Sequence, residues 1–401
     1  MIASVRRSHA LTAAGIGLLF LTVFLGGGCG SQHASAAPRS LPGAWFPYQQ
    51  GWLGGDGAYS IPLGGDRSLW IFGDTLTGAA TATSRKQATG FTHNSIAIST
   101  CPLRRDCTFR YYWAGMNTSK PKPVFSAKGS DWYWPMDGFV YHGTLYEALM
   151  QMHATGAGGA SGFAYSGVQL ASIKNYTAPP SRWSVSYQKL NTGGTAIPGV
   201  SIVVREGPDG NPDPSNPHGA NYAYFFSLVG NKRISKHLAL LRLLLSELAR
   251  AARPGNAPWE YLTSGATWRP WPKDDTALPS DNAAVLKPGA SEMTIRYHRF
   301  TNQWIAVFPV GMAKAAYYCI SPPIKGPGGP PEKLYAYPEM KSPNPNYTRH
   351  VFCYVAREHI ELEAPGQIFF TYACNSTQEK EIIDNMNLYH PVVVTRPLPH
   401  R

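Results

Sequence analysis

The sequence is poor in charged residues and in segments that could form long helices. Charged residues make up 15 % of the 401 residues, below the roughly 25 % that is usual in soluble domains. The chain contains 40 glycines and 34 prolines, and these residues interrupt helices too often for a helical bundle or a coiled coil. Hydrophobic residues still reach 43 % and aromatic residues 12 %. This excludes general disorder and provides a large core.

Several motifs that carry well-understood chemistry are also missing. There is no GxSxG nucleophile elbow, no P-loop and no GxGxxG turn between a strand and a helix, which disfavours α/β-hydrolases and nucleotide-binding folds. No CxxC or HxxxH spacing indicates a zinc site. We therefore expect no cofactor and no metal, and no nucleic-acid partner because no RNA-binding or zinc-finger motif is present.

The first residues have the pattern of an export signal. Arg6 and Arg7 precede an apolar run from Ala10 to Leu25, and three glycines then lead to Cys29. A basic start, a short apolar segment and small residues before a cysteine are typical of a bacterial lipoprotein signal. We expect a signal peptide over 1–28, a lipidated tether over 29–42 attached at Cys29, and a single domain over 43–401. Plain secretion is the alternative.

The charge and the remaining cysteines agree with an exported protein. The formal net charge is +12, which favours anionic surroundings such as acidic envelope polymers or lipid headgroups. Export permits disulfides. Cys101 and Cys107 enclose a short loop and could form a local bridge, whereas the pairing among Cys319, Cys353 and Cys374 stays open.

A strand signature recurs along the chain at intervals of 64 to 82 residues. Each copy follows a turn and consists of aromatic and branched residues, which suit half-buried strands. The copies are Leu69–Phe72, Leu145–Leu149, Tyr222–Phe226, Trp304–Phe308 and Ile368–Tyr372. Five such units predict an all-β fold, a five-bladed β-propeller. A two-domain β-sandwich with chance similarities is the alternative.

One leucine-rich segment allows two interpretations. In residues 235–252, leucines recur at helical spacing, but Leu238–Leu245 could equally be a buried strand that runs into a helical turn. We expect core packing in either case and assign no function to it.

Acidic residues precede or follow several of the predicted strands. Asp56, Asp137 and Glu292 lie on or next to the strand before a signature, and Asp74 follows the first signature. In a propeller the first strands line the central channel, so these side chains would converge there. Paired carboxyl groups suit glycoside hydrolysis, in which one donates a proton and the other activates water or attacks carbon.

Other residues near these acids are candidates for substrate binding. Trp52 and Trp134 could stack on sugar faces. His93 and Asn94 begin a strand that could face the channel, and Arg296 alternates with apolar residues in another strand.

Three stretches resemble a bacterial family known as domain of unknown function 4185. Residues 51–63 with Leu69–Thr75 are similar to its opening blade, and Asn94–Ile98, Glu292–Tyr297 and Thr371–Asn375 are similar to later landmarks. The resemblance implies a five-bladed, furanosidase-like propeller. Some members are endo-D-arabinanases of glycoside hydrolase family 183, which cut arabinogalactan and lipoarabinomannan.

The resemblance also implies roles for individual residues. Asp56 would be the general base or the nucleophile and Asp74 the general acid. Asp137 and Glu292 would bind substrate or tune the pair, and Tyr372 and Asn375 would contact substrate.

Together these patterns predict an exported, monomeric hydrolase of furanose-containing cell-envelope polysaccharide, attached to the membrane by its N-terminal lipid. The alternative function is a non-catalytic propeller lipoprotein that binds glycans or the cell envelope. A weaker alternative is a surface scaffold that binds protein partners through its blade edges.

Overall fold

The computed structural model describes residues 45–399 apart from short internal segments. The segments left out are 105, 117, 119, 157–161, 191–195, 207–220, 231–235, 251–258, 272–277, 311–313, 322–323 and 326–328. The predicted signal peptide, Cys29 and the tether lie outside the described residues. Within them, no helix is long and apolar enough to span a membrane.

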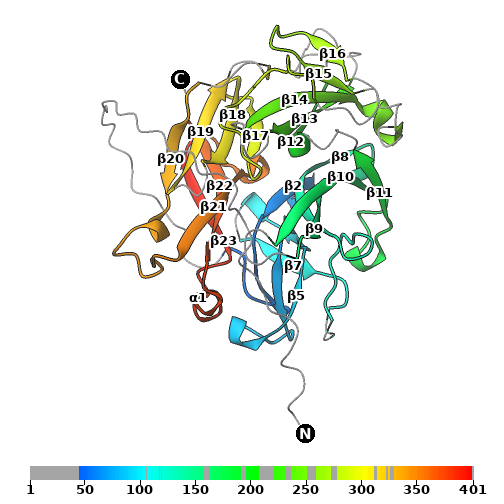
Figure 1. The fold of residues 1–401 in the computed structure, drawn as a ribbon. Coiled ribbons are helices and arrows are strands. Elements are labelled where there is room, and N and C mark those ends of the chain that lie inside the picture. The colour runs from blue at the N-terminus through cyan, green and yellow to red at the C-terminus, as the bar shows by residue number, and fades with distance from the viewer. Residues whose placement is uncertain are drawn as a thin grey trace.

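The described chain folds into six antiparallel sheets (Figure 1). The strands, grouped by sheet, are β1 (Trp52–Gly55), β4 (Thr75–Gly78) and β5 (Ala88–Thr92); β2 (Tyr59–Gly64), β3 (Arg67–Phe72), β6 (Ser95–Thr100) and β7 (Thr108–Tyr112); β8 (Trp132–Tyr141), β9 (Thr144–Ala154), β10 (Phe163–Ile173) and β11 (Val185–Leu190); β12 (Ala196–Glu206), β13 (Asn221–Val229), β14 (His237–Leu244), β15 (Glu260–Leu262) and β16 (Trp268–Pro270); β17 (Thr294–His298), β18 (Gln303–Pro309), β19 (Ala315–Ser321) and β20 (Glu332–Ala336); and β21 (Val351–Glu358), β22 (Gln367–Ser376) and β23 (Pro391–Pro397). One short α-helix, α1 (Glu379–Asp384), accompanies them in the described part of the chain. The all-β prediction is confirmed.

Each predicted signature is the second strand of a different sheet. The five copies fall in β3, β9, β13, β18 and β22. Most residues of β3, β18 and β22 are buried, because a neighbouring sheet covers each face. Their near-continuous apolar and aromatic sequence follows from burial on both faces.

The five larger sheets follow one another around a centre, in the manner of a propeller (Figure 1). The first strands β2, β8, β12, β17 and β21 contact one another in this order. The hydrophobic clusters lie between successive sheets, and one of them joins Trp70 and Phe72 of the first sheet to Phe369 and Val393 of the last. The ring therefore closes through apolar packing between sheets.

The leucine-rich segment forms a strand and then a turn of 3₁₀-helix. Strand β14 covers His237–Leu244, and the helical turn covers Leu245–Arg250. The leucines of β14 are buried between sheets. The strand interpretation is confirmed, because burial on both faces requires apolar residues at consecutive positions.

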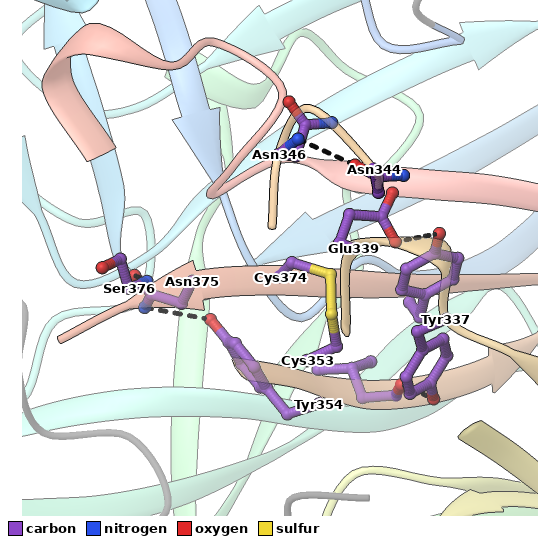
Figure 2. Close-up of a disulfide and its surroundings, with 11 residues drawn as sticks. Tyr337, Glu339, Asn344, Asn346, Cys353, Tyr354, Cys374, Asn375 and Ser376 are labelled. Atoms are coloured by element: carbon purple, nitrogen blue, oxygen red, sulfur yellow. Dashed lines mark hydrogen bonds between the residues drawn. A yellow bond between two sulfur atoms is a disulfide. The ribbon is translucent and has the colours of Figure 1, made fainter. Parts of the chain in front are cut away.

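Two disulfides hold neighbouring strands. Cys101 bonds to Cys107 around a short loop, as predicted. Cys353 of β21 bonds to Cys374, its direct cross-strand partner in β22. Figure 2 shows the second bridge between the two strands. It lies beside Tyr354 and Asn375, two residues that belong to the site described below.

Arg85 joins the beginning and the end of the described chain. Its buried guanidinium group donates hydrogen bonds to the carbonyl oxygens of Leu53, Ile382 and Asn385 at 2.7, 2.8 and 2.9 Å, and to Tyr389 at 3.2 Å. A guanidinium group has five N–H donors in a fixed fork, which suits several carbonyl groups at once.

Candidate active site

Asp56 and Asp74 lie next to each other because two adjacent turns are joined by a hydrogen bond. Asp56 directly follows β1, and Asp74 lies between β3 and β4. The backbone N–H of Gly73 donates to the backbone oxygen of Asp56 at 2.8 Å. A Cβ atom on Gly73 would lie 2.4 Å from Asp56 Oδ1. Only glycine therefore lets the Asp56 carboxyl group approach this turn so closely.

Asp56 is the more deeply placed member of the pair. It is 4 % exposed, and the Tyr354 hydroxyl donates a hydrogen bond of 2.7 Å to its Oδ2. Burial and the nearby Asp74 carboxylate raise the pKa of Asp56 to about 7, against the opposing effects of Tyr354 and Arg357. Both causes disfavour the charged form of this carboxyl group. Asp56 can therefore hold a proton near neutral pH.

Asp74 is more open and is surrounded by polar groups. Its side chain is 14 % exposed. Trp134 Nε1 donates to Asp74 Oδ1 at 3.1 Å, and His93 Nδ1 lies 3.0 Å from the same oxygen. The Tyr389 hydroxyl donates to the backbone oxygen of Asp74 at 2.9 Å. These contacts fix the carboxyl group while one side of it reaches solvent.

An aromatic group flanks Asp74. His93 stacks on Trp132 with ring centres 4.7 Å apart, and Trp132 meets Trp134 edge to face. Trp134 in turn packs edge to face on Phe163. The His93 side chain is 36 % exposed, and both tryptophans are partly exposed. Partly exposed rings next to a carboxyl pair are suited to contact with a sugar ring.

Glu292 is a third acid in this region. It lies two residues before the inner strand β17 and is partly exposed. Burial of its carboxyl group and the charge of Asp56 raise the pKa of Glu292 to about 8. The sequence interpretation placed Glu292 near the pair, and the structure brings it within electrostatic range of Asp56.

Asp137 and Arg296 have a different role from the predicted substrate contact. Asp137 is fully buried, and Arg296 donates to both of its carboxyl oxygens at 2.8 and 3.0 Å. The Ile202 backbone N–H and the Ser201 hydroxyl also donate to Asp137, at 2.7 and 3.2 Å. The carboxyl group is thus occupied by protein donors. It joins strands β8, β12 and β17, so we correct its assignment to a structural one.

Asn94 and Trp52, two more of the predicted substrate contacts, are buried. Asn94 bonds to the backbone of Phe125 and Tyr133. Trp52 is fully buried and stacks on Tyr111. Neither side chain is available to a ligand here, so we withdraw both as substrate contacts.

Tyr372 and Asn375 are also buried. The Tyr372 hydroxyl donates to Glu339 at 2.9 Å, on the side of the strand that faces the disulfide. Asn375 Nδ2 donates to the Tyr354 hydroxyl at 3.5 Å (Figure 2). Asn375 thus reaches Asp56 only through Tyr354, so we replace its direct contact with a positioning role.

Sequence reasoning missed three residues that surround the pair, namely Tyr354, Arg357 and Tyr389. All lie about 300 positions beyond Asp56 in the sequence. The segment Arg357–His359 places three ionisable residues at the end of an apolar strand. Such a sequence is costly to bury unless the charged groups are paired. It could therefore have indicated that these residues have partners elsewhere in the chain.

Comparisons with known proteins give a family and a fold. A family model described as "Domain of unknown function (DUF5005)" matches residues 43–395. No curated protein matches the chain. A candidate hydrolase from Bacteroides ovatus ATCC 8483 has a similar structure, with a TM-score of 0.63 and 14 % identity over 87 % of this chain and 86 % of that one. The comparisons do not show the resemblance to family 4185, which stays a prediction.

Two glycosidase structures are more distant. A xylan β-1,4-xylosidase from Bacillus halodurans C-125 has a TM-score of 0.43 and 12 % identity over 88 % of this chain, which spans 54 % of that protein. An endo-arabinase from Bacteroides thetaiotaomicron VPI-5482 has a TM-score of 0.42 and 12 % identity over 92 % of this chain and 99 % of that one.

Proposed function

We propose that this chain, which belongs to the DUF5005 family, is a glycoside hydrolase that acts on furanose-containing cell-envelope polysaccharide in the manner of an endo-D-arabinanase. In this proposal the five larger sheets are the blades of a five-bladed propeller. The chain is exported, and a lipid on Cys29 holds it at the membrane. The pattern of residues 1–29 supports the last two points.

The observation that carries the proposal is the pair Asp56 and Asp74. The two carboxyl groups interact electrostatically and have different surroundings. One is buried and holds a proton near pH 7, and the other is partly exposed next to two ring N–H groups. Two carboxyl groups in contrasting environments are what acid and base catalysis of glycoside cleavage requires.

The environments favour the opposite roles to those that the resemblance to family 4185 implies. Asp56, whose pKa is about 7, would donate the proton to the leaving oxygen. Asp74 would act as the ionised partner that activates water or attacks the anomeric carbon. Its charge would then stabilise the oxocarbenium-like transition state, and Tyr354 would hold Asp56 in position.

The residues around the pair suit a sugar ligand. His93, Trp132 and Trp134 form a partly exposed aromatic group on the Asp74 side. Glu292 adds a neutral carboxyl group at pH 7, because its pKa is raised to about 8, and a neutral carboxyl group can donate a hydrogen bond to a hydroxyl.

The test is sugar release by the purified chain from a panel of arabinofuranose-containing and other bacterial polysaccharides. We expect new reducing ends from at least one furanose-containing polymer. Asp56→Asn and Asp74→Asn should each lower turnover by roughly 10³-fold or more with little change in the melting temperature. The exposed Asp66→Asn is the matched control and should keep full activity. Full activity in both active-site variants would refute the site.

The low exposure of Asp56 favours a second candidate, a non-catalytic glycan-binding protein. A carboxyl group that is only 4 % exposed has little room to reach a glycosidic oxygen. In that case the same polysaccharides would bind, Trp134→Ala would weaken binding, and no reducing ends would form.

A further inference from the structure

A separate cluster of ionisable residues lies on the inner strands. His298 is the last residue of β17, Glu358 is the last residue of β21, and Glu363 follows the short 3₁₀-helix Ile360–Leu362. One nitrogen or oxygen atom of each residue lies within 4.8 Å of the others. The three residues are 4, 1 and 8 % exposed.

This cluster is remote from the acid pair. His298 comes six residues after Glu292, which interacts with Asp56 and lies before β17 begins. Along β21, Glu358 comes four residues after Tyr354, the partner of Asp56. The cluster therefore lies farther along β21 than Tyr354 and Arg357, the residues of that strand that interact with Asp56.

The atoms of the cluster approach one another closely. His298 Nε2 lies 2.6 Å from Glu358 Oε1, and His298 Nδ1 lies 3.7 Å from Glu363 Oε2. Glu363 Oε1 accepts a hydrogen bond from the Phe369 backbone N–H at 3.1 Å. His298 Nε2 and both Glu358 oxygens are buried and receive no hydrogen bond from an N–H or O–H group of the described residues.

The charges in the cluster are also unbalanced. Glu361 adds a third carboxyl group, with one buried oxygen that lacks a donor. The guanidinium group of Arg296 is bound to Asp137 through two hydrogen bonds, and that of Arg104 donates to the backbone oxygen of Glu363 and not to its carboxyl group. Buried carboxyl groups of this kind must hold protons or a cation.

We propose that His298, Glu358 and Glu363 bind a Zn²⁺ ion that joins β17, β21 and the turn after β21. One imidazole nitrogen and two carboxylate oxygens are zinc ligands, and a water molecule would complete a tetrahedral site. The imidazole ligand disfavours Ca²⁺ and Mg²⁺, which prefer oxygen. The sequence analysis predicted no metal, because the three ligands are up to 65 positions apart and form no short motif.

A second cluster of possible metal ligands in the described residues is not suited to bind a metal ion. Glu339, Cys353 and Cys374 also lie within reach of one another. The two sulfur atoms are joined in a disulfide (Figure 2) and have no thiolate to offer a metal.

The test is zinc binding by the full chain after removal of metals with a chelator. We expect one Zn²⁺ per chain and a rise in melting temperature of roughly 5 °C at a hundredfold excess over the dissociation constant. Glu358→Gln should weaken binding by about 100-fold or more. The matched control is His350→Ala, which removes a partly exposed imidazole 3.0 Å from Glu381 and should leave zinc binding unchanged.

A measurement on the wild-type chain covers the case in which Glu358→Gln does not fold. X-ray absorption at the zinc edge should show one imidazole and otherwise oxygen ligands. The proposal fails if the chain binds no Zn²⁺, if Ca²⁺ binds more tightly than Zn²⁺, or if a folded Glu358→Gln keeps wild-type affinity. Sulfur ligands or a second imidazole would also overturn it.

Discussion

Asp56 and Asp74 differ in surroundings although they are 18 positions apart and lie in adjacent turns. Burial and the neighbouring charge keep a proton on Asp56, whereas Asp74 meets a tryptophan N–H and an imidazole. Tyr354 and Trp134, which donate hydrogen bonds to Asp56 and Asp74, lie on other sheets. Chemistry at this site therefore depends on contacts that are distant in sequence.

Gly73 sets the distance between the two turns. We expect Gly73→Ala to lower turnover by at least about tenfold, because the new Cβ atom would lie 2.4 Å from Asp56 Oδ1 and displace the carboxyl group. Steady-state kinetics on the best polysaccharide would measure this. Gly265→Ala is the control, since its Cβ atom has no neighbour closer than 3.7 Å. Unchanged kinetics in Gly73→Ala would show that the position of Asp56 does not matter.

Tyr354 stabilises the charged form of Asp56. We expect Tyr354→Phe to raise the pKa of Asp56, because this hydrogen bond lowers it in the native chain. If Asp56 is the acid, the alkaline limb of kcat/KM moves upward by roughly one pH unit. The exposed Tyr347→Phe should not move it. A limb that stays in place would assign the titration to another group.

The sequence predicted the acids better than their surroundings. Asp56 and Asp74 were found because acids at strand ends are costly unless solvated or bonded. Asp137, Asn94 and Tyr372 were also predicted from the sequence as site residues, but their side chains are occupied by protein partners. A single strand does not reveal which neighbouring side chain will fill its hydrogen bonds, so these could not be separated from true contacts.

Among the elements, strands β21 and β22 matter most for the site. Tyr354 and Asn375 each follow one cysteine of the Cys353–Cys374 bridge (Figure 2). The disulfide therefore fixes the pairing of two strands whose neighbouring residues hold Asp56.

We expect the double variant Cys353→Ser, Cys374→Ser to lose roughly 3 kcal/mol of unfolding free energy and part of the activity. The bridge closes a loop with a sequence separation of 21. The matched pair Cys101→Ser, Cys107→Ser opens a bridge with a separation of only 6 and should cost less stability and no activity. Urea unfolding and kinetics would measure both. Equal losses of activity in the two variants would contradict a specific role.

The regular strands were predictable because their pattern is local. Each signature is a run of aromatic and branched residues, and each forms the second strand of a sheet. The small sheet β1–β4–β5 was not predicted. Its strands are short, and β2 and β3 of another sheet lie between β1 and β4 in the sequence. The period-2 pattern that identifies longer strands therefore has too few residues to be visible.

The whole molecule buries acids and histidines whose pKa values are shifted in opposite ways. The pKa values of Asp56, Glu292, Glu358 and Glu363 are raised. Those of His298, His359 and His390 are lowered by burial. Above about pH 6.5 the histidines are mostly neutral in both the folded and the unfolded chain, so only the acids still bind more protons in the folded state.

The melting temperature should therefore fall as the pH rises from 6.5 to 8 in the presence of a chelator. The folded chain binds more protons than the unfolded chain in this window, and stability then decreases with pH. Glu292→Gln should flatten the decrease, because the pKa of Glu292 is about 8. Calorimetry at several pH values would test this, with the exposed Asp66→Asn as control. A melting temperature that rises over the window would contradict the expectation.

The hydrogen bonds of Arg85 have a consequence for the order of events during synthesis. Their acceptors include Leu53 near the start of the described chain and Ile382, Asn385 and Tyr389 near its end. While a ribosome is still adding residues 382–389, the buried cation lacks most of its acceptors. A nascent chain truncated before these residues would lack the contacts that join its two ends, and we expect proteases to cleave it more readily than the full chain.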